Sequence, residues 1–214
     1  MADTRPHFLT RRGLVAAGLL AVPARAFAAG PKVVTILGDS ITAGLGLPAA
    51  DALPSQLHLA LAKLGVANTV RGAGVSGDTS ADGAARVDFS VQPDTALAIV
   101  ALGGNDLLQG IDPKATRANL EKIVRRLKAR HMGVLVCGLS APKEVGASYA
   151  KDFDAAFAGV AKAEGVALVP NFLAGVSRVA GLNQADSIHP NAQGVKIIAG
   201  KLAPIVAREL AKRP

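Results

Sequence analysis

The sequence has few aromatic residues and a single cysteine, and both shortages exclude classes of protein. Phe, Tyr and Trp together make up 3% of the 214 residues, and Trp is absent. A surface on which nucleic-acid bases stack needs several aromatic rings, so the composition argues against that kind of binder. The one cysteine, Cys137, cannot form an internal disulfide, and its apolar neighbours indicate a small core residue.

Charged residues are also scarce, at 19%, whereas hydrophobic residues reach 50%. This balance is sufficient for a full aliphatic core and excludes an intrinsically disordered chain. A chain of 214 residues most simply forms one domain.

The first thirty residues differ from the rest. Arg11 and Arg12 precede a short apolar stretch at residues 13–22, and Ala26-Phe27-Ala28 follows as a small-x-small cleavage pattern. These are the parts of a secretory signal, and the apolar stretch is too short to span a bilayer. The paired arginines resemble the twin-arginine export signal. We therefore expect a signal peptide at residues 1–28 and one folded domain at residues 29–214, exported to the periplasm or secreted. An amphipathic or buried N-terminal helix is the alternative.

Removal of such a leader changes the charge of the protein. The leader carries four Arg and one Asp, so the formal net charge falls from +8 to +5. Part of the basic character therefore belongs to the leader.

Apolar segments alternate with helical patterns along the remaining chain. Runs rich in Val, Ile, Leu and Ala predict strands at residues 33–37, 66–70, 96–102, 133–137 and 166–169. Most of these runs are continuously apolar, which is typical of a parallel sheet covered on both faces. Helices are expected at residues 54–64, 113–130, 149–164 and 194–212. The alternation predicts a doubly wound α/β sandwich.

In such sheets, ligands bind beyond the carboxyl ends of the strands. The segments that follow the expected strands are residues 38–46, 71–79, 103–112, 138–146 and 171–191. Chemistry is therefore sought in these loops.

Ser40 lies just past the first expected strand, in Gly38-Asp39-Ser40. A helix that begins there favours nearby negative charge, which acyl transfer needs because its tetrahedral intermediate carries an oxyanion. Asp39 or Ser40 equally fits a simple helix cap. This stretch alone does not distinguish a nucleophile from a cap.

Asp186 and His189 lie in the last of these loops. A serine nucleophile needs a base, and the base needs a carboxylate to orient it. Three residues separate the two, so one turn can bring the carboxylate to the imidazole. Among the other histidines, His7 belongs to the leader, His58 lies in an expected helix and His131 follows a helix end, which leaves His189 as the best base.

Two more loops contain donors suited to an oxyanion. Residues 72–78 read Gly-Ala-Gly-Val-Ser-Gly-Asp, and residues 103–106 read Gly-Gly-Asn-Asp. A glycine N–H can approach a ligand closely, and an Asn side chain offers an NH2 donor. Each loop alone fits an ordinary turn equally well.

In their order along the chain, these pieces resemble the sequence blocks of the SGNH, or GDSL-type, hydrolases. The longer segments around these blocks, such as GDSITAGLGLP and DSIHPNAQG, resemble those of the bacterial thioesterase, arylesterase and lysophospholipase branch. The resemblance extends over nearly the whole mature chain. The matching blocks are Gly38-Asp39-Ser40, Gly77 within Val-Ser-Gly-Asp, Gly103-x-Asn105-Asp106, and Asp186-x-x-His189-Pro190.

The resemblance implies a flavodoxin-like three-layer α/β/α fold with a five-stranded parallel sheet and neither metal nor cofactor. It implies that Ser40 is the nucleophile, His189 the base and Asp186 the orienting carboxylate. The N–H groups of Ser40 and Gly77 and the Asn105 side chain would form the oxyanion hole. The implied reaction is hydrolysis of acyl esters or thioesters through an acyl-serine intermediate.

Leu107, Leu108 and Ile111 follow the oxyanion asparagine, where the resembling branch flanks its acyl group. They predict an apolar wall suited to acyl chains, although packing under the next helix is an equal alternative. Two positions depart from the family pattern: many relatives carry Asn at Gly72 and Gly at Ser187, and either change can alter loop rigidity.

Other functions also fit parts of the sequence. One is a carbohydrate-acetyl esterase of the same family. Gly72-x-Gly74-x-x-Gly77 matches the dinucleotide fingerprint, but it follows the second strand instead of the first. Residues 114–130 hold seven basic residues against Glu121 alone, which fits an anionic lipid surface or a solvated helix face. We expect a small-molecule or lipid acyl substrate, no nucleic acid, no stable membrane anchor, and a monomer or weak oligomer.

Overall fold

Five parallel strands form the centre of the molecule in the computed structural model, which describes residues 1–2 and 30–213. The strands are β1 (Lys32–Gly38), β2 (Asn68–Gly74), β3 (Thr95–Ala101), β4 (Gly133–Cys137) and β5 (Ala167–Val169). Their order across the sheet is β2-β1-β3-β4-β5, which is the flavodoxin-like order. The expected signal peptide lies outside the described residues, apart from its first two positions.

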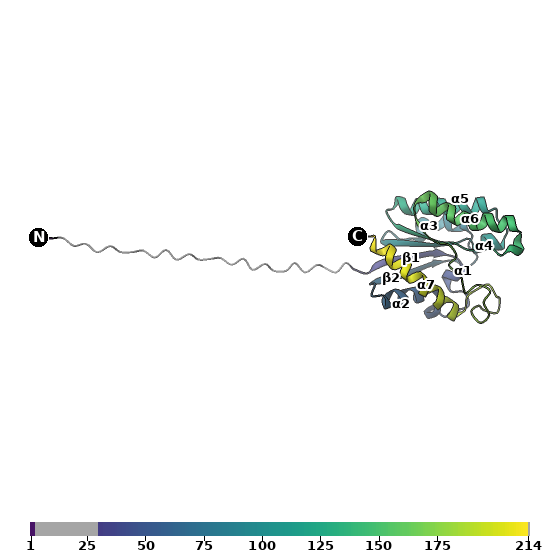
Figure 1. The fold of residues 1–214 in the computed structure, drawn as a ribbon, viewed down its shortest axis with the longest axis horizontal. Helices are drawn as coiled ribbons and strands as arrows, with labels where there is room; N and C mark the ends of the chain where they lie inside the picture. Colours follow the sequence, from purple (N-terminus) through teal and green to yellow (C-terminus); the bar gives the residue numbers. More distant parts are fainter. Residues whose placement is uncertain (3–29, 214) are drawn as a thin grey trace.

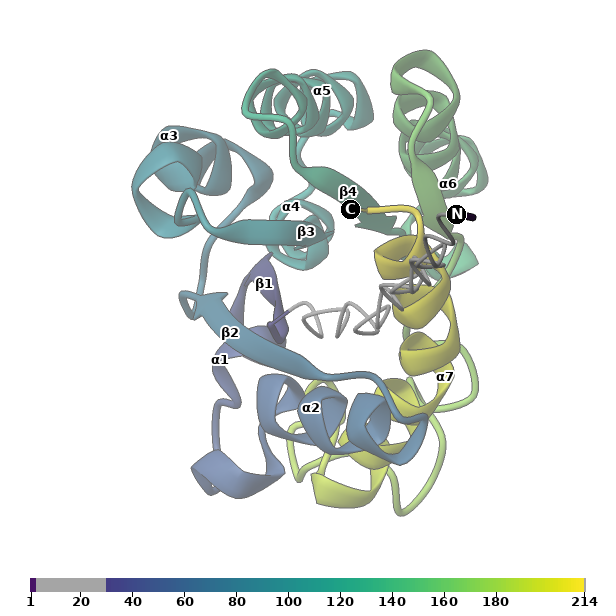
Figure 2. The ribbon, with the colours of Figure 1, turned by 90° about the vertical axis from the view of Figure 1, so that its left-hand side faces the viewer.

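Helices cover both faces of this sheet, as Figure 1 shows. One face carries α2 (Leu53–Lys63) and α7 (Ala192–Ala211), and the other carries α3 (Ser80–Ser90), α5 (Pro113–Ala129) and α6 (Ala147–Glu164). The same two helical layers stand on either side of the strands in Figure 2. The shorter pieces are α1 (Ser40–Ala43), α4 (Gly104–Leu108) and two 3-10 turns, Ala49–Asp51 and Lys143–Val145. The predicted three-layer α/β/α sandwich is confirmed.

The centre of the sheet is built from aliphatic side chains, as the aromatic-poor composition requires. Ile36 on β1, Ile99 on β3 and Leu135 on β4 have no exposed surface. Burying such a side chain contributes roughly 1.5–3 kcal/mol to folding. Cys137 at the end of β4 is also fully buried, and burial raises the pKa of its thiol to about 12. The thiol therefore stays protonated and acts as a small apolar side chain.

Helix α5 forms as the sequence predicts. The Asp112 side chain accepts a hydrogen bond from the N–H of Lys114, 2.8 Å away, and Pro113 occupies the first helical position. The buried stripe along this helix consists of Thr116, Leu120, Ile123, Val124 and Leu127. Its spacing is that of an amphipathic helix on a core.

Strand β2 begins two residues later than expected and extends to Gly74. The N–H of Val66 is still bonded to the carbonyl of Leu61 at the end of α2, so this residue terminates a helix. The extension passes through Gly72 and Gly74, where other chain segments come very close. A Cβ on Gly72 would lie 2.7 Å from Pro54 Cγ, and one on Gly74 would lie 2.4 Å from the Ala43 nitrogen. These glycines are needed for packing within β2.

Helix α3 has no counterpart among the predicted elements. Its sequence, SADGAARVDFS, contains few large apolar residues, so no stripe marks it. Gly83 and Ala84 are buried where α3 packs against the core, and the space there admits only small residues. A Cβ on Gly83 would lie 2.2 Å from Leu102 Cδ1. The signal for the helix was its start, where Thr79 and Asp82 form a capping box.

None of the helices in the described part of the chain combines the length and the apolar character needed to cross a membrane.

Candidate active site

The nucleophile candidate stands at the turn between β1 and α1. The Asp39 side chain accepts a hydrogen bond from the N–H of Ile41, 3.0 Å away, and so caps α1, of which Ser40 is the first residue. Gly38 is required just before it, because an added Cβ would lie 2.1 Å from Thr42 Oγ1. The cap interpretation is confirmed for Asp39, and the cap places Ser40 at the start of α1.

Ser40, His189 and Asp186 form one connected row. Ser40 Oγ lies 2.8 Å from His189 Nε2, although 149 residues separate them. His189 Nδ1 lies 2.6 Å from Asp186 Oδ2. Because the carboxylate can only accept, Nδ1 carries the proton and Nε2 is free to accept from the serine hydroxyl. The structure thus brings the three predicted residues together in the order that acyl transfer requires.

The turn after Asp186 holds this carboxylate in place. Asp186 Oδ1 accepts hydrogen bonds from the backbone N–H groups of Ile188, at 2.9 Å, and His189, at 3.0 Å. The hydrogen bond from the His189 ring, with these backbone bonds, lowers the pKa of Asp186 to about 2. Ser187 has a φ of +60°, in the left-handed region that favours glycine. This explains why glycine fits the position that Ser187 occupies.

The predicted oxyanion donors converge near Ser40. Gly77, with φ +90°, lies in the loop after β2, and Asn105 lies in α4 after β3. Asn105 Nδ2 donates one hydrogen bond to the Asp78 carbonyl, 2.8 Å away, which leaves its second N–H available. Ser40, Gly77, Asn105 and His189 all line one cavity of about 170 Å³. Its wall therefore holds all the predicted polar groups of the reaction except Asp186.

Asp39 adds a buried carboxylate to this cavity. Only 5% of the residue is exposed. Burial raises the pKa of Asp39 to about 6, and the nearby Asp78 adds to the rise, whereas the Ile41 N–H and His189 oppose it. The sequence analysis treated Asp39 as a cap alone and did not anticipate this role in the electrostatics of the site.

A larger, mainly apolar cavity of about 550 Å³ adjoins the first. The two share Asp39, Ile41, Gly104, Leu108 and Ile188. Leu107 and Leu108 line the larger cavity, as expected for an apolar wall. Ile111 lines neither cavity; its carbonyl accepts a hydrogen bond from the Tyr149 hydroxyl at 2.8 Å. The sequence analysis missed the residues from later loops, which are Leu139, Phe172, Leu173 and Ile188.

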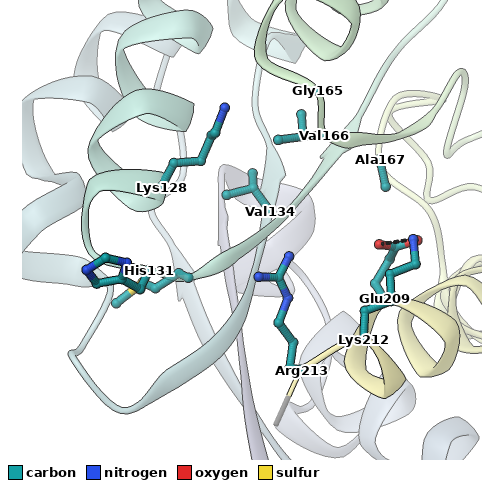
Figure 3. Close-up of a pocket in the computed structure, with 10 residues that line it drawn as sticks. Lys128, His131, Val134, Gly165, Val166, Ala167, Glu209, Lys212 and Arg213 are labelled. Atoms are coloured by element: carbon teal, nitrogen blue, oxygen red, sulfur yellow. Dashed lines mark hydrogen bonds and ion pairs between the residues drawn. The ribbon is translucent and has the colours of Figure 1, made fainter.

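Another cavity, of about 650 Å³, lies away from these residues and is shown in Figure 3. It is lined by residues from the starts of β4 and β5 and from the ends of α5 and α7, at the amino ends of the strands. Lys128, His131 and Arg213 project around it, and Lys212 is paired with Glu209 at 2.7 Å. It has no serine in its wall, so acyl transfer is not assigned to it.

The basic face of α5 is partly balanced by acidic residues. Arg117 lies 2.9 Å from Glu121, and Arg125 lies 2.6 Å from Glu164. Arg126 pairs with Asp88 at 3.2 Å. Five of the seven basic residues thus share three acidic partners, so this face keeps a net positive charge, and the pairs do not decide between an anionic surface and a solvated helix face.

A second buried carboxylate supports the loops around the site. Asp106 has no exposed surface and accepts hydrogen bonds from the Ser80 N–H at 2.7 Å and the Thr116 hydroxyl at 2.9 Å. It thereby joins α4 to the starts of α3 and α5. Among the described residues, no group of three or more His, Cys, Asp and Glu side chains is placed to hold a metal ion.

Comparison with known proteins agrees with this geometry. A sequence model of the GDSL-like Lipase/Acylhydrolase family matches residues 36–197. Esterase TesA of Pseudomonas aeruginosa is 38% identical over 180 residues, covering 84% of this chain and 90% of that protein. Thioesterase 1/protease 1/lysophospholipase L1 of Escherichia coli is 34% identical over 177 residues, covering 82% of this chain and 84% of the relative.

A solved structure of TesA has the same fold. Its TM-score is 0.79 at 35% identity, and the match covers 83% of this chain and 99% of that chain. The family match spans all four blocks that carry the resemblance, from the Gly-Asp-Ser turn to Asp186 and His189. The chain therefore belongs to the GDSL-like lipase/acylhydrolase family, and it is an ester-bond hydrolase with the SGNH fold.

Proposed function

We propose that this hydrolase cleaves acyl esters and thioesters through an acyl-serine intermediate, with Ser40 as nucleophile, His189 as base and Asp186 as its orienting group. The observation that carries the proposal is the connected row from Ser40 Oγ through His189 to Asp186, with bonds of 2.8 and 2.6 Å. The names of the relatives, an esterase and a thioesterase/lysophospholipase, support the same substrate class.

Acylation begins when Ser40 Oγ bonds to the acyl carbon. His189 Nε2 takes the hydroxyl proton, and the electron pair of the carbonyl double bond moves onto its oxygen. The resulting oxyanion is held by the N–H groups of Ser40 and Gly77 and by the Asn105 amide. Asp186 stabilises the imidazolium that forms and keeps its Nδ1–H in place.

The intermediate then collapses. The carbonyl double bond re-forms, the bond to the alcohol or thiol breaks, and His189 Nε2–H protonates this leaving group. Deacylation repeats the two steps with water in place of the serine: His189 takes a proton from water, the hydroxyl attacks the acyl carbon, and Ser40 Oγ leaves with the proton from His189. The products are the free acid and the restored enzyme.

The apolar cavity favours acyl chains over sugar acetates as substrates. It opens beside the serine cavity and is walled by Leu107, Leu108 and the apolar residues of later loops. Each methylene that enters it contributes about 0.8 kcal/mol, or roughly a fourfold gain in kcat/KM. The gain should end when the cavity is filled.

A kinetic series tests the proposal. We expect Ser40→Ala to lose turnover of p-nitrophenyl butyrate by orders of magnitude, whereas Ser148→Ala, an exposed serine on α6, retains it. For the wild type, kcat/KM should rise from acetate through butyrate to octanoate esters. Turnover retained by Ser40→Ala contradicts the nucleophile assignment, and a maximum at acetate favours the carbohydrate-acetyl esterase.

We further propose that the protein is exported by the twin-arginine route before it acts. The proposal rests on Arg11, Arg12 and the apolar stretch after them. Expression of the full chain in a Gram-negative host should give periplasmic esterase, and replacement of both arginines by lysine should retain it in the cytoplasm. Periplasmic activity unchanged by that replacement excludes this route.

A further inference from the structure

Arg86 on α3 makes more polar contacts with the edge of the sheet than its place on a surface helix requires. Its Nε donates to Asp78 Oδ2 at 2.5 Å, and its Nη2 donates to the carbonyl of Gly38 at 2.9 Å. Its Nη1 donates to the carbonyl of Ala73 and to Ser90 Oγ, both at 3.0 Å. The side chain is 20% exposed, and that of Asp78 is 12% exposed. One guanidinium therefore joins α3 to the ends of β1 and β2.

Two of these acceptors, Gly38 and Asp78, lie within two residues of a proposed oxyanion donor. Gly38 is two residues before Ser40, and Asp78 directly follows Gly77. The Asp78 carbonyl also accepts the hydrogen bond from Asn105 Nδ2 at 2.8 Å. Asp78 is thus bonded through its side chain to Arg86 and through its backbone to Asn105. The three donors come from three different loops, and their supports meet at this one ion pair.

We infer that Arg86, paired with Asp78, is a positioning residue that fixes the three oxyanion donors relative to one another. Arg86 lines neither of the cavities at the site, so it acts through the backbone and not by contact with substrate. The planar guanidinium suits this task, because its donors are fixed in one fork and diverge toward separate acceptors. This inference rests on the proposed function, since it assigns the donors to the oxyanion.

The geometry predicts a loss in the chemical step with little loss in substrate binding. Without Arg86, the carbonyls of Gly38 and Ala73 lose a donor and Asp78 loses its counter-ion. Small displacements of catalytic donors are costly: a misplacement of about 1 Å can reduce the rate roughly 10²-fold. The apolar cavity is untouched, so KM should change little.

The test compares Arg86→Met with Arg71→Met, using the full chain. Arg71 forms an exposed ion pair with Asp94 at 2.5 Å, away from the site, so the control loses the same charge and a comparable contact. Active sites are first counted by titration with a p-nitrophenyl phosphonate, and kcat is then expressed per titrated site. We expect kcat to fall roughly 10²-fold for Arg86→Met and to remain at the wild-type value for Arg71→Met.

A second readout separates positioning from folding. An alkyl trifluoromethyl ketone forms a hemiketal oxyanion with the serine and uses the same donors. Its inhibition constant should rise in Arg86→Met in parallel with the fall in kcat/KM. A purely structural role would instead reduce the number of titrated sites and leave both values per site unchanged, which would overturn the inference.

Two milder variants cover the case in which Arg86→Met does not fold. Arg86→Lys keeps the charge but lacks the fork, and Asp78→Asn keeps an acceptor but removes the counter-charge. Each should lower kcat per titrated site and weaken the ketone, and wild-type values for both would refute the positioning role. If the wild type itself does not hydrolyse the ester, the proposed function fails. If the wild type is active and these variants match it, only the inference about Arg86 fails.

Discussion

Replacement of Asp39 by asparagine should stabilise the protein, and by more as the pH rises. The folded protein raises the pKa of this carboxyl from 3.8 to about 6, mainly by burial. The folded state thus binds the proton more tightly than the unfolded chain does. Stability from this group is therefore greatest below about pH 4 and is lost as the pH rises toward 6. Above about pH 6, the buried ionised carboxylate lowers the free energy of unfolding by a constant amount.

The size of this cost follows from the two pKa values. Each pH unit between them corresponds to about 1.4 kcal/mol, so full ionisation of Asp39 costs up to about 3 kcal/mol of unfolding free energy. The asparagine side chain retains an oxygen that can accept the Ile41 N–H, so the cap is kept. The difference in stability between Asp39→Asn and the wild type should therefore grow by up to about 3 kcal/mol from pH 4 to pH 8.

The assay is urea unfolding of both proteins at a series of pH values, with the free energy of unfolding compared at each. Asp94→Asn is a control with the opposite sign, because its hydrogen bond to Arg71 lowers the pKa of Asp94. That variant should lose stability relative to the wild type as the pH rises from the lowered folded pKa of Asp94 to the unfolded value of 3.8, with no further change above it. A difference for Asp39→Asn that is independent of pH, or that shrinks as the pH rises, refutes the burial argument.

Three further substitutions test other parts of the account. Asp186→Asn should reduce kcat by about 10⁴-fold, since an amide does not hold the required His189 tautomer; steady-state kinetics with unchanged KM would show this, and near-normal kcat would contradict it. Asn105→Ala should reduce kcat roughly 10²–10³-fold by removing an oxyanion donor, and a change confined to KM would argue against that role. Gly74→Ala should lower the free energy of unfolding, measured in urea, by about 1–3 kcal/mol or more, because the added Cβ meets backbone atoms. Gly200 faces open space, so Gly200→Ala should instead stabilise its helix by about 0.5–1 kcal/mol. Equal effects of the two substitutions would contradict the packing argument.

Much of the fold follows from local patterns. The continuous apolar runs marked the central strands because β1, β3 and β4 are covered on both faces, so nearly all of their side chains are apolar. Strand β2 was placed less well because it is an edge strand whose second half is Arg-Gly-Ala-Gly. Those glycines are required by close neighbours that only the tertiary structure supplies. Helix α3 was not predicted because its buried face consists mainly of small residues, which leave no apolar stripe in the sequence.

The site shows the same division between pattern and context. Ser40, Asp186 and His189 belong to short motifs, so the sequence named them before any geometry was known. The residues that support them do not share a motif. Arg86 lies 48 residues from Gly38, to which it donates, and nothing in its own segment indicates such a contact. Ile111 shows the converse, because an apolar residue near a motif need not face the cavity.

The most direct test of the account is to identify the nucleophile chemically. Diethyl p-nitrophenyl phosphate transfers its phosphoryl group to an activated serine, with release of p-nitrophenolate, and mass spectrometry of the digested protein locates the adduct. We expect one adduct, on Ser40, formed in proportion to the loss of activity and absent in His189→Gln, while the matched His131→Gln variant is labelled like the wild type. Complete inactivation with the label on another residue, or equal labelling of His189→Gln, would contradict the catalytic row.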